Sequence, residues 1–243
     1  MAVYSDDYYA GRGPDPLVDY KFELDFPEGT IRLYEWRGIT TAIKSLTHVE
    51  ASTSWLDFGC GNGGLVRYCR NQHICEAVGF EEGAIRDEAA YHGIPILHRG
   101  DLKNRSGAFD VVTAIEVLEH IEDPLPTLRQ IRSLLKPGGL LFLTTGNAQP
   151  HRAKLLDWPY VIPEIHVSFY EPETLRQALL RTGFWPEFRG YLPGFTDVIR
   201  FKILKNLRVR RLAAWQDLLP WPVIARLADA RYHITSLPIA WAA

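Results

Sequence analysis

Several kinds of residue are scarce in this chain of 243 residues, and each scarcity excludes a class of protein. Cysteine occurs three times, and Cys60, Cys69 and Cys75 form neither a C-x-x-C pair nor a disulfide framework. We therefore expect a reducing compartment and predict a cytoplasmic protein. No apolar run approaches the roughly 18 residues that a membrane-spanning helix needs. The acidic opening MAVYSDDYYAGRG is not expected to act as a signal peptide.

The chain also lacks an excess of charge of either sign. It has 27 lysines and arginines against 29 acidic residues, a net charge of −2. Nucleic acid is therefore not an expected partner, because binding it needs a large basic surface. The local exception runs from Arg200 to Arg211, with six cations and no acid. This segment can be a solvated helix face, or it can contact an acidic substrate, a carrier protein or, weakly, a membrane surface.

Apolar runs alternate with amphipathic stretches through the middle of the chain. The runs predict strands at residues 54–58, 76–81, 94–101, 140–147 and at the start of 108–120. The stretches between them predict helices at residues 64–72 and 82–93 and a third that begins at 123 and is stopped by Pro137, Gly138 and Gly139. Such alternation at short spacing is typical of an α/β fold, in which helices cover both faces of a parallel sheet.

The flanking segments show other patterns. Residues 1–48 predict an N-terminal arm and a cap helix at 30–46, and residues 49–192 predict the ligand-binding core. Within that core, 148–170 is rich in proline and aromatic residues and predicts a loop over the site, followed by a helix at 171–184 and a strand at 185–192. Residues 193–230 predict a helical insertion, a lid or an interface, and 231–243 a possible final strand.

The glycine-rich stretch WLDFGCGNGGL at residues 55–65 follows the first predicted strand. Ligands of open parallel sheets bind beyond the carboxyl ends of the strands, which is where these glycines lie. The stretch contains G-x-G-x-x-G, which by itself does not distinguish NAD from another nucleoside. Glu81 ends the second strand. Its separation from the glycine loop is about that at which a carboxylate can bind both hydroxyl groups of a ribose. No second βαβ half for a nicotinamide nucleotide follows, which argues against NAD.

Five stretches in order resemble the successive motifs of class I S-adenosylmethionine-dependent methyltransferases. They are LDFGCGNGGL, VGFE, GDL, FDVVTAIEVLEHIEDP and LLKPGGLLFLTTGN, and the resemblance covers about residues 50–185. It is strongest to small-molecule enzymes that methylate quinone precursors and secondary metabolites. The resemblance implies a Rossmann-like, mostly parallel sheet of seven strands with the last strand antiparallel. It also implies S-adenosylmethionine as cofactor and a small molecule as methyl acceptor.

Within this resemblance, each cofactor group has an expected partner. Glu81 would bind the ribose, Asp101 would accept from the adenine amino group, and the Leu102 backbone would donate to adenine. Carboxylates would also serve the cationic end, with Asp57 reaching the ammonium through water and Glu116 lowering the cost of the sulfonium charge. The remaining expected contacts are the glycine loop at Gly59, Cys60, Gly61 and Gly63, the apolar walls at Phe80 and Ile115, and Arg37 on the cofactor carboxylate.

O-methylation needs a proton acceptor, and histidine is suited to that role. His166 lies in the loop expected over the strand ends and is our first candidate for the base. His120 is the second, in a supporting or direct role. No metal is assigned, but Glu116, Glu119 and His120 lie at i, i+3 and i+4. With His166 they form an alternative ligand set for Mg²⁺ or Mn²⁺.

The sequence leaves several alternatives open. The E-x-x-E-H pattern resembles that of metal-assisted methyltransferases, including enzymes that methylate RNA 2′-hydroxyl groups. N- or C-methylation and non-catalytic binding of the cofactor are also compatible with the motifs. The aromatic residues of the arm and of the 148–170 loop are expected to line a pocket for a planar or apolar acceptor. Neither the identity of the acceptor nor the oligomeric state can be read from a motif.

Overall fold

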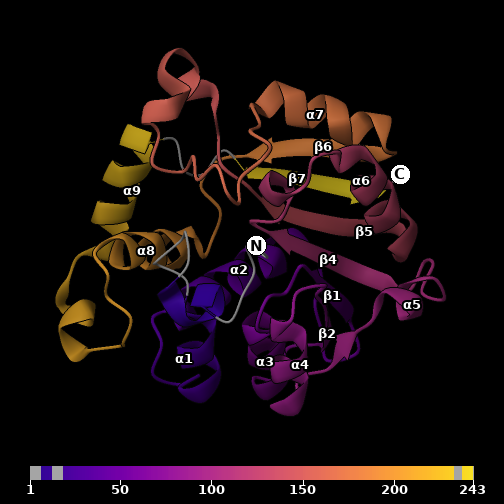
Figure 1. Ribbon diagram of the computed structural model, residues 1–243, viewed down its shortest axis with the longest axis horizontal. Helices are drawn as coiled ribbons and strands as arrows, with labels where there is room; N and C mark the ends of the chain where they lie inside the picture. Colours follow the sequence, from indigo (N-terminus) through magenta and orange to yellow (C-terminus); the bar gives the residue numbers. More distant parts are fainter. Residues whose placement is uncertain (1–6, 13–18, 233–236, 243) are drawn as a thin grey trace.

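The computed structural model describes residues 7–12, 19–232 and 237–242, and a seven-stranded sheet forms its centre (Figure 1). The strand order is β3-β2-β1-β4-β5-β7-β6. Strands β1 to β5 pair in parallel, and β7 runs antiparallel to both of its neighbours. The strands are β1 (Ser54–Phe58), β2 (Glu76–Phe80), β3 (Ile96–Leu97), β4 (Phe109–Ile115), β5 (Leu135–Thr144), β6 (Phe184–Arg189) and β7 (Leu237–Ala242). This arrangement confirms the predicted fold class.

Helices cover both faces of the sheet, as the apolar character of the strands predicts. In β1, Trp55 belongs to a core cluster with residues of α2 and α3, whereas the next residue, Leu56, belongs to a second cluster with α6 and α7. The α-helices are α1 (Tyr20–Asp25), α2 (Arg32–Leu46), α3 (Gly64–Asn71), α4 (Ile85–Tyr91), α5 (Arg99–Leu102), α6 (Pro124–Leu134), α7 (Pro172–Arg181), α8 (Phe195–Asn206) and α9 (Trp221–Tyr232). Shorter helical segments are η1 (Tyr8–Arg12), η2 (Leu118–His120), η3 (Gln149–Asp157) and η4 (Ala214–Leu218).

Two predicted boundaries in the core are wrong. The strand expected at 94–101 is only two residues long, because Asp101 accepts a hydrogen bond from the His98 backbone at 2.8 Å and caps the short helix α5. The helix that Pro137, Gly138 and Gly139 were expected to stop ends earlier, at Leu134, and β5 begins at once. Pairing with β4 then shifts register, so the residues before Leu140 form a bulge, with Gly138 at a φ of +73°.

The segments outside the sheet are more helical than expected. The predicted N-terminal arm contains η1 and α1, and the predicted 148–170 loop contains η3. In the insertion, α8 packs along α2, and Figure 1 shows α8 and α9 to the left of the sheet. The final strand is β7, whereas residues 233–236 of the predicted strand lie outside the described residues. No helix within the described residues is both long and apolar enough to cross a bilayer.

Candidate functional site

The glycine loop joins β1 to α3 and depends on left-handed backbone. Gly59, Gly61 and Gly63 have φ values of +75°, +54° and +71°, which glycine adopts without steric cost. A Cβ at Gly63 would lie 2.7 Å from Ile94 Cγ2. The loop is tied to β2 because the amides of Gly59 and Cys60 both donate to the Phe80 carbonyl, at 2.8 and 3.0 Å. The cradle therefore exists only with these glycines in place.

Two carboxylates flank this loop. Asp57 is buried and accepts a hydrogen bond from Thr113 Oγ1 at 2.7 Å. Burial, with a smaller contribution from the charge of Glu81, raises the Asp57 pKa to about 7. The Glu81 carboxylate accepts from the backbone amides of Gly61, at 2.9 Å, and Gly83, at 2.7 Å. The Glu81 carboxylate is thus bound to the glycine loop, and Asp57 is fully ionised only well above pH 7.

Tyrosines of the N-terminal segment lie directly on the loop. The rings of Tyr9 and Tyr20 stack with centroids 6.1 Å apart. A Cβ added at Gly61 would lie 3.1 Å from the Tyr20 ring, and one at Gly83 would lie 2.4 Å from the Tyr9 hydroxyl. The sequence placed these tyrosines at an acceptor pocket, whereas here they contact the cofactor cradle. A nucleoside that binds the loop has to pack against these rings or displace them.

The remaining predicted cofactor residues divide between the core and the surface. Phe80 and Leu102 are buried, and the Phe80 ring lies 4.9 Å from that of Phe58. The Cys60 thiol lies against Gly79, and burial raises its pKa well above the usual range, so it is no nucleophile. Ile115 ends β4 and packs against the core cluster that contains Trp55. Asp101 is exposed, with its carboxylate on the His98 amide.

Arg37 is held by the insertion rather than by the loop. Its Nε and Nη2 donate to the two carboxylate oxygens of Asp197 on α8, at 2.7 and 2.9 Å. This planar two-point contact raises the pKa of the guanidinium and joins α2 to α8. A contact between Arg37 and the cofactor carboxylate stays a prediction.

Glu116, the residue after β4, has a left-handed backbone with a φ of +53°. Such a conformation is costly for a residue with a Cβ and is concentrated at functional sites. Its carboxylate accepts from Thr144 Oγ1 at 2.8 Å, from the Tyr160 hydroxyl at 3.1 Å and from Lys202 Nζ at 3.4 Å. Burial alone would raise the Glu116 pKa, but Lys202 and the two hydroxyl groups outweigh it and lower the pKa to about 2. Glu116 is therefore ionised.

Glu119 lies beside Glu116 and has the opposite protonation state. Its side chain is fully buried, and burial, followed by the charge of Glu116, raises its pKa to about 8. The Tyr160 hydroxyl lies 2.5 Å from Glu119 and 3.1 Å from Glu116, but it has only one hydrogen to donate. A protonated Glu119 resolves this, because it donates to the Tyr160 oxygen while Tyr160 donates to Glu116.

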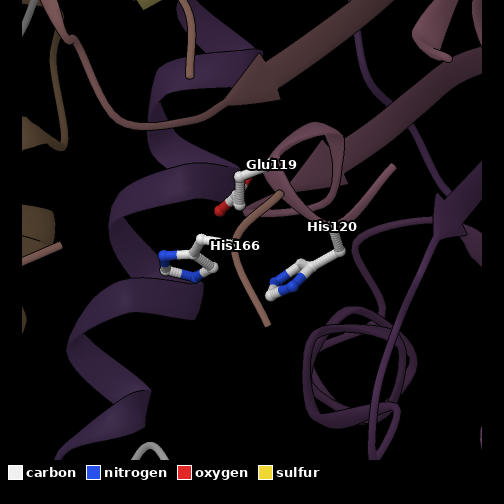
Figure 2. Close-up of side chains that lie close together, drawn as sticks. All are labelled: Glu119, His120 and His166. Carbon is white, nitrogen blue, oxygen red and sulfur yellow. The ribbon is translucent and has the colours of Figure 1, made fainter. Parts of the chain in front are cut away.

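His120 and His166 face each other next to Glu119 (Figure 2), with ring centroids 4.9 Å apart. His120 Nδ1 lies 2.8 Å from the Ile165 carbonyl, and His166 Nδ1 lies 2.5 Å from the Tyr160 carbonyl. A carbonyl can only accept, so each Nδ1 carries the hydrogen. In the neutral rings, Nε2 is then the nitrogen with a lone pair. It can accept a proton or bind a metal.

Ligand atoms of Glu119, His120 and His166 lie within 4.8 Å of one another, which suits a divalent cation. The ligand set predicted from the sequence also included Glu116, whereas the structure brings together only Glu119, His120 and His166. Metal-bound histidines usually donate their second nitrogen to a carbonyl or carboxylate, as both rings do here. Against this, both Glu119 oxygens already have partners, the Tyr160 and Thr145 hydroxyl groups.

Two residues of the site were not predicted as such. Tyr160 was expected only to line an acceptor pocket, and Lys202 only as one cation of the 200–211 segment. Tyr160 belongs to an aromatic stack, with Trp158 4.7 Å from its ring and His151 4.5 Å from that of Trp158. The sequence signal that could have revealed them is the aromatic density of the 148–170 segment and the position of Lys202 in a helix expected to act as a lid.

The sequence matches the methyltransferase domain family over residues 32–186, more than half of the chain. It is 36% identical over 143 residues to a ubiquinone biosynthesis O-methyltransferase of Caulobacter vibrioides, covering 51% of this chain and 56% of that protein. It is 34% identical over 105 residues to the enzyme of the same name from Pseudomonas aeruginosa, covering 39% and 45%. The chain spans about half the length of the curated relatives it matches.

Two solved structures share the fold. A putative methyltransferase of Haloferax volcanii, solved with the Trm112 methyltransferase activator, has a TM-score of 0.54 at 18% identity and covers 92% of this chain and 97% of its own. A SAM-dependent methyltransferase of Archaeoglobus fulgidus has a TM-score of 0.52 at 17% identity, covering 91% and 97%.

The chain thus belongs to the S-adenosylmethionine-dependent methyltransferases of class I, and S-adenosylmethionine is its cofactor. The described residues fit that group. The left-handed glycine loop leaves room for close approach of a nucleoside, and the carboxyl groups of Asp57 and Glu81 flank it.

Proposed function

We propose that this chain transfers the methyl group of S-adenosylmethionine to a hydroxyl group of a small-molecule acceptor. The observation that carries the proposal is the orientation of His166, whose Nδ1 is fixed by the Tyr160 carbonyl. Its Nε2 is then available as the proton acceptor that a hydroxyl nucleophile needs. The curated relatives are named as O-methyltransferases, which supports the same acceptor group.

The cofactor supplies a methyl group already activated by a positively charged sulfur. Glu81, Asp101 and the backbone of Leu102 would bind its nucleoside, and the ionised Glu116 would compensate the charge of the sulfonium. His166 takes the acceptor proton as the new bond forms. Much of the remaining effect is positioning, because a displacement needs the two reacting groups about 3–3.5 Å apart and aligned.

Replacement of the base tests this role. His166→Ala is expected to lower kcat by about a hundredfold or more at neutral pH, while the affinity for S-adenosylhomocysteine stays within about twofold. The measurement is single-turnover methyl transfer to catechol, alongside calorimetry with S-adenosylhomocysteine. His92→Ala, an exposed histidine on the surface after α4, is the matched control and is expected to behave as wild type.

The outcomes separate the alternatives. An unchanged rate in His166→Ala would contradict the base assignment and favour N- or C-methylation, in which the nucleophile needs no deprotonation. Binding of S-adenosylhomocysteine without transfer to any acceptor would favour a non-catalytic binding protein.

A metal-assisted reaction is the second candidate, supported by the proximity of Glu119, His120 and His166. In that case a calorimetric titration should show one Mn²⁺ ion binding to the complex with S-adenosylhomocysteine. The heat of Mn²⁺ binding should disappear in Glu119→Ala. A chelator then abolishes transfer. Absence of Mn²⁺ heat leaves His166 as the proton acceptor of a metal-free reaction.

A further inference from the structure

Large apolar side chains gather on the exposed surface of the insertion. Five of them lie within residues 213–230, with exposed fractions from 39% for Leu219 to 84% for Leu218, and the other three are Trp215, Val223 and Leu227. We call these five side chains the end surface, because the segment from η4 to α9 lies at the left-hand end of the molecule, away from the sheet (Figure 1). Exposed apolar side chains scattered singly need no explanation, whereas a group of them marks an interaction site.

The outward face of α9 is apolar apart from one arginine. Trp221 and Ala225 are buried against the rest of the fold, whereas Val223 and Leu227 are exposed. Arg226 is exposed as well, and the spacing of i, i+3 and i+4 places it on the same face as Val223 and Leu227. No acidic side chain is exposed among residues 221–230. The outer side of this helix thus combines apolar surface with positive charge.

The turn before α9 is polar inside and apolar outside. Gln216 is fully buried, where its Oε1 accepts from the Tyr34 hydroxyl at 3.1 Å and its Nε2 donates to the Arg211 carbonyl at 2.9 Å. Its neighbours Trp215 and Leu218 are exposed to solvent instead. A surface that only has to be hydrated shows the opposite preference for these residue types. The hydrogen bonds of Gln216 therefore hold the apolar side chains outward.

Further positive charge lies on the loop that leads to η4. Arg208 and Arg211 are exposed on this loop, as Arg226 is on α9. Within the part of the chain that the structure describes, no acidic side chain pairs with any of these three. Asp217 is the exposed acid of residues 213–230, and its Oδ1 accepts from the buried Arg200 at 2.7 Å. The apolar end surface is therefore accompanied by a net positive charge.

The position of Arg226 distinguishes between two partners for such a face, a second copy of this chain and a lipid surface. A second copy would enclose the guanidinium among apolar side chains, which is costly for an unpaired charge. The exposed acid that the copy could bring to it, Asp217, is already bound to Arg200. On an anionic bilayer the apolar side chains reach the acyl boundary, while arginines bind the phosphates of the headgroups. Charge complementarity therefore favours the lipid surface.

We propose that the end surface binds the surface of an anionic lipid bilayer. Leu218, Val223 and Leu227 insert at the level of the headgroups, and Arg226 donates to lipid phosphate. The chain then lies on the membrane without crossing it, as amphipathic segments do. This inference goes beyond methyl transfer and holds whichever acceptor the enzyme uses.

Binding to vesicles tests the proposal. We expect the protein to co-sediment with vesicles made of equal parts of phosphatidylglycerol and phosphatidylcholine, and to bind pure phosphatidylcholine vesicles at least about fivefold more weakly. Raising NaCl from about 0.1 M to about 1 M should weaken binding to the anionic vesicles, because salt screens the charges. No binding to the anionic vesicles, or equal binding to the two kinds, would overturn the proposal.

A pair of matched double variants locates the contact. Arg226→Gln combined with Leu227→Ser removes one charge and one apolar side chain from α9, so we expect the partition coefficient on anionic vesicles to fall at least about tenfold. The control combines Leu180→Ser with Arg181→Gln. It changes the same two residue types at adjacent exposed positions of α7, and should bind vesicles as wild type does.

Equal vesicle binding by the two double variants would overturn the end surface as the contact. Sedimentation equilibrium on the same preparations examines the other partner. A wild-type dimer that the α9 variant converts to a monomer would assign this face to a second copy and overturn the lipid proposal. Methyl transfer to catechol in solution, measured without vesicles, reports on the proposed function separately and should be unchanged in both double variants.

Discussion

At the scale of single residues, the site is organised by the contrast between two neighbouring glutamates. Glu116 has hydroxyl and ammonium donors and keeps its charge, whereas Glu119 is enclosed and holds a proton. Tyr160 connects them and fixes His166 through its carbonyl. One aromatic residue thus orients both the acidic pair and the proposed base.

The proton on Glu119 makes stability depend on pH. Its pKa is about 8 in the folded protein against an ordinary value of 4.5. Its contribution to stability is therefore complete below about pH 4.5 and is lost as pH rises to about 8. Glu119→Gln keeps the shape and cannot ionise, so the melting temperature of this variant relative to wild type should rise by several degrees between pH 5 and pH 8.

Differential scanning calorimetry across that pH range provides the measurement. Glu122→Gln, an exposed glutamate three residues further on, is the control and should follow the wild-type curve. Parallel curves for wild type and Glu119→Gln would show that Glu119 does not hold a proton in the folded state.

At the scale of elements, the contact between α2 and α8 positions the insertion. Gly38 and Gly194 meet at this crossing, and a Cβ at Gly194 would lie 2.2 Å from the Gly38 carbonyl oxygen. Beyond the crossing, α8 carries Lys202 to Glu116 and Asp197 to Arg37. The helix pair therefore connects the cap to Glu116, beside the cluster of Glu119, His120 and His166.

Alanine at Gly194 should break this contact. The position has a φ of +90° as well as the close approach, so we expect a loss of about 3 kcal/mol in the free energy of unfolding and a melting temperature lower by roughly 6–12 °C. Gly190→Ala is the control, because a Cβ there meets no atom within 4 Å. Equal melting temperatures for the two variants would mean that the helices do not cross as described.

At the scale of the whole molecule, the sequence predicted the parts of the fold that depend on local pattern. Alternating apolar runs predicted the sheet and its layers, and the glycines predicted the loop at the end of β1. The length of β3 was missed because the Asp101 side chain, rather than an apolar pattern, ends that strand. The start of β5 was missed because a bulge accommodates proline and two glycines that normally end a helix.

The contacts that complete the site could not be predicted because they join distant parts of the chain. Tyr160 reaches Glu119 across 41 residues, and Lys202 reaches Glu116 across 86. Neither contact lies in a motif or follows a helical or strand period. His120 and His166 were named as separate candidates, and only the tertiary fold brings their rings together with Glu119.

Calorimetric titration of S-adenosylhomocysteine into wild type and Glu81→Gln tests most directly where the cofactor binds. The wild-type protein should bind one equivalent, and the variant should bind at least about tenfold more weakly, because it loses the carboxylate that we propose accepts from the ribose hydroxyls. Glu82→Gln, the exposed neighbouring glutamate that pairs with Arg99, should bind as wild type does. No binding heat from folded wild-type protein, or equal affinity in Glu81→Gln, would contradict the assignment of the glycine loop and Glu81 as the cofactor site.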